Sequence, residues 1–435
     1  RISRISRNVV HSPRVTTMKD EAETAYTRIE AQENGGHKHD VPQASLAAIT
    51  TNLITAGLGT GILSLPWATA GASLLPSMAM TAAVMALNGA TVMIIVSAGE
   101  KWKAYDLGAL LGNLPGHCSQ GVGYFCNTLT WVSVFLCLVG YVDVISDALQ
   151  QLLAADFAGS ATRAIILTIS AIAVLPVCFF DQRLLSFSSS LGITINVYMF
   201  VLVAALLAQE GAAPGICVAG AGTGLVTLFS TLMQCGIIQM CVLPMYEELK
   251  DRNPHRFQRA VIIAFSFLTF LFCAFSGLAY LKYGPGVRSN ITKDFPEDSL
   301  GNMARVGMAV VVLAVYPIIL KSMTAPIQHW EEGRHSGQLW RSRLSTVVIV
   351  AASAVGANFA GRLGTVQALN GALQVSAFVA VAPGLTGLFL LGRRGPVWQG
   401  TMYGLVALGF VASALGFVYT SNEVDSVAER CVWPA

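Results

Sequence analysis

The sequence predicts an all-α polytopic membrane protein. Of its 435 residues, 54% are hydrophobic and only 12% are charged, and the mean hydropathy is +0.60. A soluble domain of this length would need far more charged surface. Apolar runs of about 20 residues, the length that crosses a bilayer as a helix, recur along most of the chain. Two of these runs contain glycine, proline and polar residues near their middle.

Eleven such spans follow one another with short connections. They cover approximately residues 45–70, 73–98, 121–149, 162–180, 186–208, 223–246, 259–282, 302–322, 342–361, 364–391 and 397–420. Together they form one transmembrane domain, residues 41–422, which a short tail, residues 423–435, follows. Residues 1–40 are polar and lack an apolar core, so we expect a disordered arm without a cleavable signal peptide. The chain begins at Arg1 and not at a methionine, so its natural start can lie upstream.

The positive charges predict which ends of the spans face the cytosol. If the N-terminal arm is inside, 20 Lys and Arg residues lie on the inner side and seven on the outer side. Because cytosolic connections carry the excess of Lys and Arg, we expect a cytosolic N-terminus and an outer or lumenal C-terminus. Asn290-Ile291-Thr292, a glycosylation acceptor pattern, lies on the outer side in this orientation. The expected location is the plasma membrane or a vacuolar or lysosomal membrane.

The first span contains a break. Gly57, Gly59 and Gly61 precede Pro66 at a depth where lipid cannot pair with an opened backbone. Such a break persists only where protein or a water-filled cavity surrounds it, and secondary transporters hold small polar solutes at unwound backbone. Gly57-x-x-x-Gly61 also has the spacing of small residues at packed helix interfaces. This span alone leaves both interpretations open.

The sixth span repeats the pattern. Met233, Gln234, Cys235 and Gly236 place polar and small residues at its middle, and a proline follows them. Spans one and six begin two consecutive groups of five spans, and an odd number of spans inverts the second group relative to the first. In such inverted repeats the two broken helices meet at mid-membrane. The alternative is that Gln234 and Gln239 merely form interhelical hydrogen bonds.

Several segments recur in one known family. They are Gly59-Thr-Gly-Ile-Leu-Ser-Leu-Pro66-Trp-Ala, Tyr105-Asp-Leu-Gly-Ala-Leu-Leu-Gly112, Leu243-Pro-Met-Tyr-Glu-Glu-Leu249, Asn290-Ile291 and Tyr316-Pro317. In this order, over residues 44–420, the chain resembles the amino acid/auxin permease (AAAP) family of the APC superfamily. The resemblance implies a LeuT-like five-plus-five inverted repeat with broken helices 1 and 6 and an eleventh helix. It also implies secondary active transport of amino acids driven by a cation gradient.

The two breaks then predict the substrate site. The substrate carboxylate is expected at unpaired backbone N–H groups of the first break, since a helix end of this kind favours an anion. The residues are Gly57, Gly59, Thr60 and Gly61. The α-amino group is expected at acceptors of the second break. These residues are Met233, Gln234, Cys235 and Gly236.

The positions of ion coupling differ from those of sodium-coupled relatives. The sodium-coupled neutral amino acid transporters of the family have Asn where this chain has Thr55 and Thr where it has Val315. A valine side chain offers sodium no oxygen ligand. The resemblance therefore implies transport that is coupled to protons or independent of sodium, and a sodium-coupled carrier stays the alternative.

Proton coupling needs a titratable group that is shielded from lipid. Asp143 is the candidate, because Asp147 lies on the same helix face and two like charges so close oppose ionisation of both. The alternative is that both carboxylates simply meet water at the outer end of the third span. Lys321 is expected to extend toward the inner interface or to replace a bound cation.

Motifs of other functional classes are absent from the sequence. It has no Walker loop, nucleophile elbow, zinc-protease helix or Rossmann fingerprint, so we expect no enzyme, cofactor or metal site. The net charge of +3 is too small to indicate a nucleic-acid partner. Of the nine cysteines only Cys217 and Cys431 lie on the outer side, where one disulfide can form. The expected partners are an amino acid, a coupling proton and membrane lipid.

Two other functions remain alternatives. An amino acid sensor would bind the solute with little transport and signal through the N-terminal arm. A channel is less favoured, because the sequence shows no ring of charged residues and no repeated filter segment.

Overall fold

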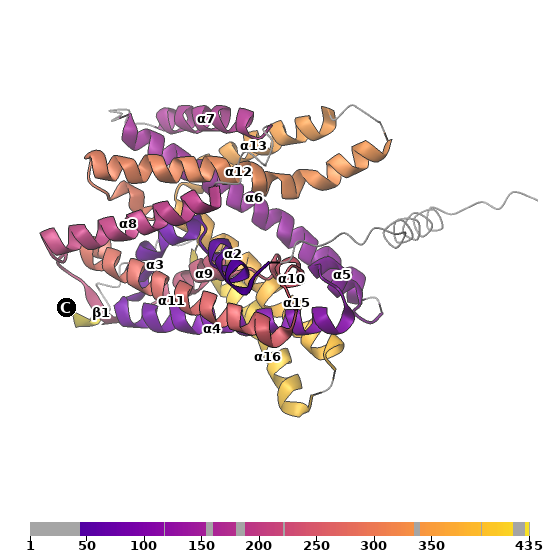
Figure 1. Cartoon of the computed structure of the whole chain (residues 1–435). Helices are drawn as coiled ribbons and strands as arrows, with labels where there is room; N and C mark the ends of the chain where they lie inside the picture. The colour runs from indigo at the N-terminus through magenta and orange to yellow at the C-terminus, as the bar shows by residue number, and fades with distance from the viewer. Residues whose placement is uncertain are drawn as a thin grey trace, which may run out of the picture. The chain divides into compact units, whose positions relative to one another are not determined.

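A computed structural model describes residues 44–116, 118–153, 160–179, 188–220, 222–334, 340–392, 394–420 and 431–434, and the chain is drawn in Figure 1. The expected disordered arm, residues 1–40, lies outside these residues. Most of the expected C-terminal tail, residues 423–435, does so as well.

The described residues form helices and one pair of short strands. In chain order the elements are α2 (Leu46–Gly57), η1 (Thr60–Ser64), α3 (Leu65–Ala72), α4 (Leu74–Trp102), α5 (Leu107–Gly112), α6 (Cys118–Leu152), α7 (Ser160–Val177), α8 (Ser188–Glu210), β1 (Cys217–Gly220), α9 (Gly224–Gly236), α10 (Val242–Glu247), α11 (Pro254–Tyr283), η3 (Gly284–Gly286), η4 (Ile291–Lys293), α12 (Ser299–Arg334), α13 (Trp340–Ala360), α14 (Leu363–Gln374), η5 (Val375–Val381), α15 (Ala382–Leu385), η6 (Thr386–Leu390), α16 (Pro396–Thr420) and β2 (Cys431–Pro434).

Most of the predicted spans coincide with long apolar helices. Among the described residues eight helices are long and apolar enough to cross a membrane, or nine if the bent pair formed by α2 and η1–α3 is one span. The other two predicted spans, 162–180 and 223–246, coincide with shorter apolar helices, α7 and α9 followed by α10. The protein is therefore an all-helical, multi-pass integral membrane protein.

Local sequence sets several helix ends. The Asn253 side chain caps α11 and accepts the His255 N–H at 2.9 Å, and Pro254 occupies the first helical position, where its missing N–H costs nothing. Between α3 and α4 the chain turns at Ser73, whose φ of 66° is in the left-handed region. Its hydroxyl group donates to the Gly220 carbonyl at 3.2 Å, which ties this turn to β1.

Two groups of helices pack closely among themselves. One contains α6, α7, α12 and α13, and the other contains α3, α4, α9 and α11, with α2 packed against α11 (Figure 1). α14 packs on both α9 and α6 and therefore connects the two groups. The breaks of the first and sixth predicted spans lie beside α14, because α14 also contacts η1.

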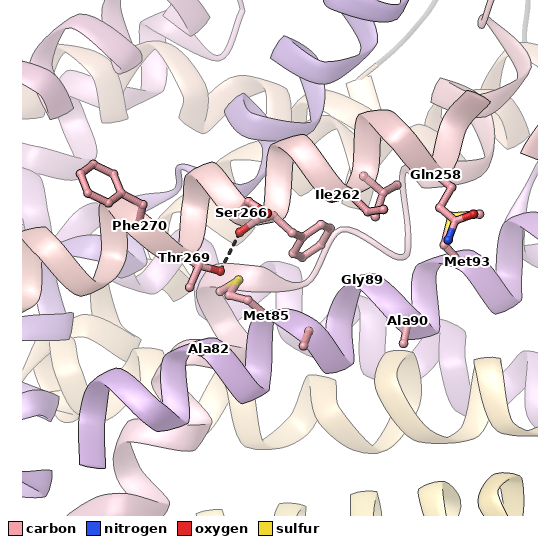
Figure 2. A pocket seen from close by; sticks show the side chains of 13 residues that line it. Ala82, Met85, Gly89, Ala90, Met93, Gln258, Ile262, Ser266, Thr269 and Phe270 are labelled. Atoms are coloured by element: carbon pink, nitrogen blue, oxygen red, sulfur yellow. Dashed lines mark hydrogen bonds between the residues drawn. The ribbon is translucent and has the colours of Figure 1, made fainter. Parts of the chain in front are cut away.

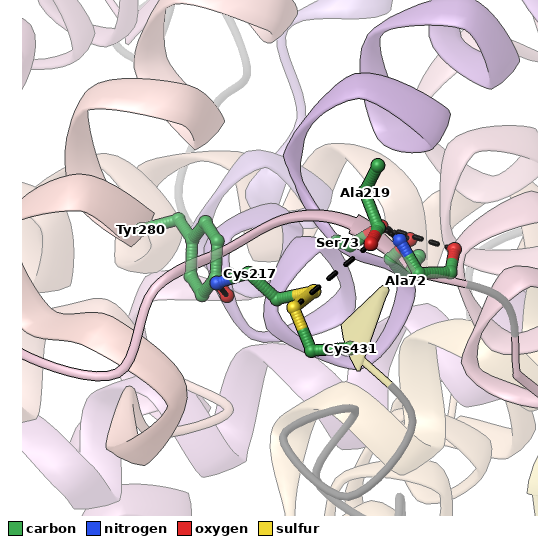
Figure 3. The surroundings of a disulfide bond; sticks show 7 residues. Ala72, Ser73, Cys217, Ala219, Tyr280 and Cys431 are labelled. Carbon is green, nitrogen blue, oxygen red and sulfur yellow. Dashed lines mark hydrogen bonds between the residues drawn. A yellow bond between two sulfur atoms is a disulfide. The ribbon is translucent and has the colours of Figure 1, made fainter. Parts of the chain in front are cut away.

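The C-terminal strand is fastened to the segment between α8 and α9 (Figure 3). Cys217 and Cys431 form a disulfide with their Cα atoms 5.7 Å apart, and β1 and β2 pair in antiparallel orientation. The Cys217 N–H donates to the Tyr280 hydroxyl at 2.8 Å, and the Gly220 N–H donates to Ser73 Oγ at 2.9 Å. The disulfide, which the sequence left as a possibility, therefore ties the C-terminal strand to α11 and to the turn after α3.

The disulfide predicts that a cut chain stays in one piece. A protease site inserted between Gly395 and Pro396 separates Cys217 from Cys431 in sequence. After cleavage we expect the C-terminal fragment to remain attached in a denaturing gel without reductant and to separate with reductant. A Cys431→Ser chain should release the fragment under both conditions. Release from the unsubstituted chain without reductant would contradict the pairing.

Candidate functional site

The first transmembrane segment opens between α2 and η1. Leu58 (φ −88°, ψ 67°) and Gly59 (φ −91°, ψ −174°) are not helical, and the helices on either side are bent by 45°. Within the described residues the Gly59 N–H has no backbone partner. The 3-10 helix η1 begins at Thr60, so its first N–H groups also lack intrahelical acceptors. The predicted break is present and presents backbone donors.

The second break follows Gly236. α9 ends at this residue, Ile237 is extended (φ −80°, ψ 112°), and α10 begins only at Val242. The Ile237 N–H donates to the Met233 carbonyl at 3.2 Å. The other carbonyl groups in the last turn of a helix lack intrahelical donors. This break therefore presents acceptors where the first presents donors.

The two breaks meet at Gly61 and Cys235. A Cβ atom added at Gly61 would lie 2.5 Å from Cys235 Sγ, so a side chain here would displace the Cys235 thiol. Thr60 beside it accepts a hydrogen bond from Gln367 of α14, with 3.2 Å between Nε2 and Oγ1. The structure thus brings together residues that are more than 170 positions apart in sequence.

Two of the predicted site glycines face other helices. An added Cβ atom at Gly57 would lie 2.6 Å from Leu268 Cδ1 on α11, and one at Gly236 would lie 2.9 Å from Met85 Cε on α4. Both glycines thus permit close helix packing, and for Gly57 this is the alternative that the Gly57-x-x-x-Gly61 spacing left open. Gly236 faces α4 and not the first break.

Gln239 ties the second break to α4. Its side chain is fully buried, and Nε2 donates to Asn88 Oδ1 at 2.9 Å and to Thr91 Oγ1 at 3.0 Å. Its Oε1 accepts the Ile238 N–H at 3.0 Å. Asn88 Nδ2 is directed at Met233 Sδ, 3.7 Å away. For Gln239, the alternative of interhelical hydrogen bonding is therefore correct.

A small cavity of about 50 Å³ borders the first break. Its wall consists of Leu58, Gly59, Thr60, Tyr141, Asn196, Met308, Val311, Val312 and Val315. This space can hold a few water molecules, since one water needs about 10–15 Å³ of such space. A Cβ atom added at Gly59 would meet no atom within 4 Å, so Gly59 faces open space.

Asn196 of α8 is a polar residue of this wall that the sequence analysis missed. It is 3% exposed, and its Nδ2 donates to the Gly192 carbonyl at 2.7 Å, whereas its Oδ1 has no hydrogen-bond partner. The only signal in the sequence was one asparagine in an apolar span. Val315, which replaces the threonine of sodium-coupled relatives, lines the same cavity, whereas Thr55 and Lys321 do not.

The N-terminal half of the first span has a polar, exposed face. Thr51 and Asn52 are exposed and Thr55 is partly exposed, and their spacing places them on one side of α2. Gly59, which follows the end of α2, is exposed as well. The Thr55 hydroxyl donates to the Thr51 carbonyl at 2.9 Å. Polar side chains in membrane spans usually face protein or water and not lipid. This face is therefore a candidate path from the start of α2 to the break.

Two aspartates of α6 form buried ion pairs. Asp143 Oδ1 lies 2.7 Å from Arg163 Nη2 of α7, and the same guanidinium nitrogen donates to the Ala357 carbonyl of α13 at 3.1 Å. Asp147 Oδ1 lies 2.6 Å from Lys293 Nζ. Both aspartates are 2% exposed, so the alternative that they simply meet water is wrong.

A buried arginine organises the loop that carries Lys293. Arg305 of α12 is 1% exposed and donates hydrogen bonds to main-chain carbonyl oxygens of the loop. These belong to Thr292, Phe295 and Pro296. Burial raises the pKa of the loop's Asp294 carboxyl, and this effect exceeds the lowering by Arg288 beside it. Because η4 contacts η1, the loop lies next to the first break.

A larger groove of about 630 Å³ runs between α4 and α11 (Figure 2). Its lining is mostly apolar and includes the buried Met85 and the exposed Ile262 and Phe270. Exposed apolar side chains on membrane helices are typical of contact with lipid. The groove therefore belongs to the membrane-facing surface, although Met85 also reaches Gly236 from its other side.

Comparisons with known proteins identify relatives of the chain. Residues 42–422 match the family model described as transmembrane amino acid transporter protein. The chain is 22% identical to amino acid transporter AVT6E of Arabidopsis thaliana over 87% of this chain and 83% of that protein. It is 25% identical to AVT1J of the same plant over 85% and 88%, and 21% identical to human solute carrier family 38 member 8 over 87% and 92%.

One solved structure of similar fold is the manganese transporter of Eremococcus coleocola. The TM-score is 0.50 at 13% identity, and the match covers 88% of this chain and 90% of that chain. At this identity the likeness concerns the fold alone.

The structure predicts that Asn290 carries no glycan in the folded protein. Asn290 is 1% exposed, and its Nδ2, the atom that would bear the sugar, donates to Asp147 Oδ2 at 2.9 Å. Glycosidase treatment of protein from eukaryotic cells should leave its gel mobility unchanged. Glu297→Asn creates the pattern Asn-Asp298-Ser299 at an exposed site of the same loop and should gain a glycan if the loop faces outward. A mobility shift of the unsubstituted chain would contradict the prediction.

Proposed function

The chain belongs to the transmembrane amino acid transporter family, and we propose that it is a secondary active carrier that holds an amino acid between its two broken helices. It is a transport protein and not an enzyme. One observation carries the proposal, namely that the breaks meet at Gly61 and Cys235 with donors on one side and acceptors on the other. The carboxylate and ammonium groups of an amino acid complement such a pair of helix ends.

We infer eleven transmembrane segments by counting α7 and the α9–α10 pair as spans. The first group of five then consists of α2–α3, α4, α6, α7 and α8, and the second of α9–α10, α11, α12, α13 and α14. Each group begins with a broken helix, as in an inverted repeat. α16 is the eleventh segment.

The substrate carboxylate binds at the start of η1 in this proposal. Gly57 ends α2, and the N–H groups of Gly59, Thr60 and Gly61 follow as donors. The ammonium group binds at the end of α9, where carbonyl groups are the acceptors. The residues that form this side are Met233, Gln234, Cys235 and Gly236.

The path to the site starts at the N-terminal end of α2. The exposed face that runs from Thr51 to Gly59 supports access from this side. On the other side, the loop held by Lys293 and Asp147 lies over the first break. Transport then requires that the two helix groups move relative to each other around the site, as in other carriers with broken helices.

We propose that the accessible side is the cytosol. The excess of Lys and Arg on this side supports the assignment, and the Cys217–Cys431 disulfide on the opposite side is consistent with an oxidising outer or lumenal space. The plasma membrane and a vacuolar or lysosomal membrane both meet this condition.

Protons are the coupling ion in our proposal. Val315 gives the cavity at the break no oxygen ligand, and the Thr55 hydroxyl is bonded within its own helix. Asp143 is the candidate proton carrier. Its protonation would weaken the pair with Arg163, which also holds the Ala357 carbonyl, and would thereby loosen the contact of α6 with α7 and α13.

Valine at either central glycine should abolish amino acid binding. In Gly61→Val the side chain meets Cys235 Sγ, and in Gly59→Val it fills the space next to the break. We expect affinity to fall by at least about 100-fold, or about 2.7 kcal/mol, with membrane insertion intact. Gly404→Val in α16, where an added Cβ atom also meets nothing, is the control. Unchanged affinity of both central variants would contradict the site.

Uptake of a labelled amino acid panel into proteoliposomes tests the function itself. We expect uptake that a proton gradient stimulates and that sodium does not change. One pH unit provides about 1.4 kcal/mol, which equals about tenfold accumulation per proton moved. Dependence on sodium at fixed pH and voltage would refute the ion assignment. Binding without flux would contradict a carrier and is the behaviour of a sensor.

Asp143→Asn tests the proton carrier separately. The variant should lose gradient-driven accumulation but keep exchange of internal for external substrate, because exchange needs the site without net proton movement. Asp251→Asn, which changes an exposed carboxylate in the connection between α10 and α11, is the control and should still accumulate substrate. Full accumulation by Asp143→Asn would reject Asp143 and leave the carrier function standing.

A further inference from the structure

α14 carries three carboxamide side chains on one face. Gln367, Asn370 and Gln374 follow one another at spacings of three and four residues, which places them in a row along the helix. Each is 4% exposed or less. The span 363–390 that contains them is more deeply buried than the other long apolar helices among the described residues. These amides therefore face protein at membrane depth.

The three amides connect α14 with the first break and with α6. Gln367 donates to Thr60 Oγ1 in η1, as described above. Asn370 Nδ2 lies 3.1 Å from the Ser133 carbonyl and 3.2 Å from Cys137 Sγ, both on α6. Gln374 Nε2 donates to Ser133 Oγ.

Gln234 of the second break joins the same row, since its Nε2 lies 3.4 Å from Cys137 Sγ. We call these six residues the polar seam. They are Ser133, Cys137, Gln234, Gln367, Asn370 and Gln374. The seam links α6, α9 and α14 at the point where the breaks meet.

The seam satisfies its donors but not all of its acceptors. The side-chain oxygens of Gln234 and Gln374 are buried and have no hydrogen-bond partner. A buried amide without a compensating hydrogen bond costs about 2–7 kcal/mol, depending on the reference state. Gln239 differs, because both its nitrogen and its oxygen are paired. Hydrogen bonding between helices explains the burial of Gln239. It does not explain the two unpaired oxygens of the seam.

α14 and α9 cannot move closer together to give these oxygens hydrogen-bond partners. A Cβ atom added at Gly371 would overlap the Ser230 carbonyl oxygen, so α14 and α9 are already in backbone contact. Directly after Gln374 the helix widens into the π-helix η5, a geometry that often marks functional sites. The seam therefore keeps two fixed acceptors beside the breaks.

We propose that the polar seam is part of the solute site, and that the Gln234 and Gln374 oxygens accept N–H groups of the bound amino acid. This inference rests on the proposed carrier function. None of the six side chains carries a formal charge, so the chemistry that fits is a hydrogen-bond donor and not an anion. Two groups of an amino acid provide it, the α-ammonium group of every substrate and the side-chain amide of glutamine or asparagine.

Gln374→Met tests the seam, because methionine keeps the length of the side chain and removes the carboxamide. Dissociation constants of L-leucine and L-glutamine are measured on the purified full chain. Gln399→Met in α16 is the control, a glutamine outside the seam. If the oxygen binds the α-ammonium group, both ligands should bind about tenfold to about 100-fold more weakly. If it binds a side-chain amide, only L-glutamine should weaken, by about threefold to tenfold.

Unchanged affinity for both ligands in Gln374→Met would overturn the inference, as would an equal loss in Gln399→Met. If the unsubstituted chain binds neither these nor other amino acids, the carrier function fails, and the seam falls with it. A folded Gln374→Met that binds normally rejects the seam alone.

Native Cys137 gives a second readout that needs no substitution. It is partly buried in the seam, whereas Cys273 lies on α11 and is directed at the Met78 carbonyl of α4. Mass spectrometry of alkylated protein should show that L-leucine or L-glutamine slows the modification of Cys137 and leaves Cys273 unchanged. Equal rates at Cys137 with and without ligand would overturn the inference, even if Gln374→Met fails to fold.

Discussion

A bilayer supplies no hydrogen bonds to a backbone, and the arrangement of this protein depends on that constraint. Leu58, Gly59 and the residues after Gly236 leave the helix at a depth where lipid would penalise them by several kcal/mol. They are stable there because Gly59 borders a cavity and because each break lies against the other. Gly61 permits this close approach, since a Cβ atom at that position would overlap the Cys235 thiol.

The same constraint explains how the breaks are supported. α4 reaches the second break through Gln239, whose amide is fully paired with Asn88 and Thr91. α14 reaches the first through Gln367. The two supports differ in chemistry, because the α4 contact pairs both the nitrogen and the oxygen of Gln239, whereas α14 also carries Gln374, whose carboxamide oxygen has no partner. α4 therefore supports the second break, whereas α14 supports the first break and, in our proposal, also offers the substrate a hydrogen-bond acceptor.

Charged groups occupy a separate layer near the C-terminal end of α6. Asp143 pairs with Arg163 of α7, and Asp147 pairs with Lys293 of the loop beside η1. Buried ion pairs contribute little net stability, because desolvation offsets most of their attraction, but the removal of one partner is costly. Such pairs suit a part of the protein that must hold one arrangement firmly and release it when a proton or a conformational change removes a partner.

The amino-acid sequence alone determined the membrane class, the positions of most spans, both breaks and the family, because hydrophobic length, glycine spacing and short motifs are local properties. It did not determine which way a side chain points around a buried helix, since that depends on contacts between segments hundreds of residues apart. Gly236 faces α4, and Asn290 of the glycosylation pattern is buried against Asp147. Gln374 of α14 donates a hydrogen bond to Ser133 of α6. In a polytopic protein every span is apolar on several faces, so hydrophobic periodicity does not reveal the helix rotation. Tertiary packing decides it, because the helix rotation is the one that brings buried polar groups such as Gln239 to partners on other helices.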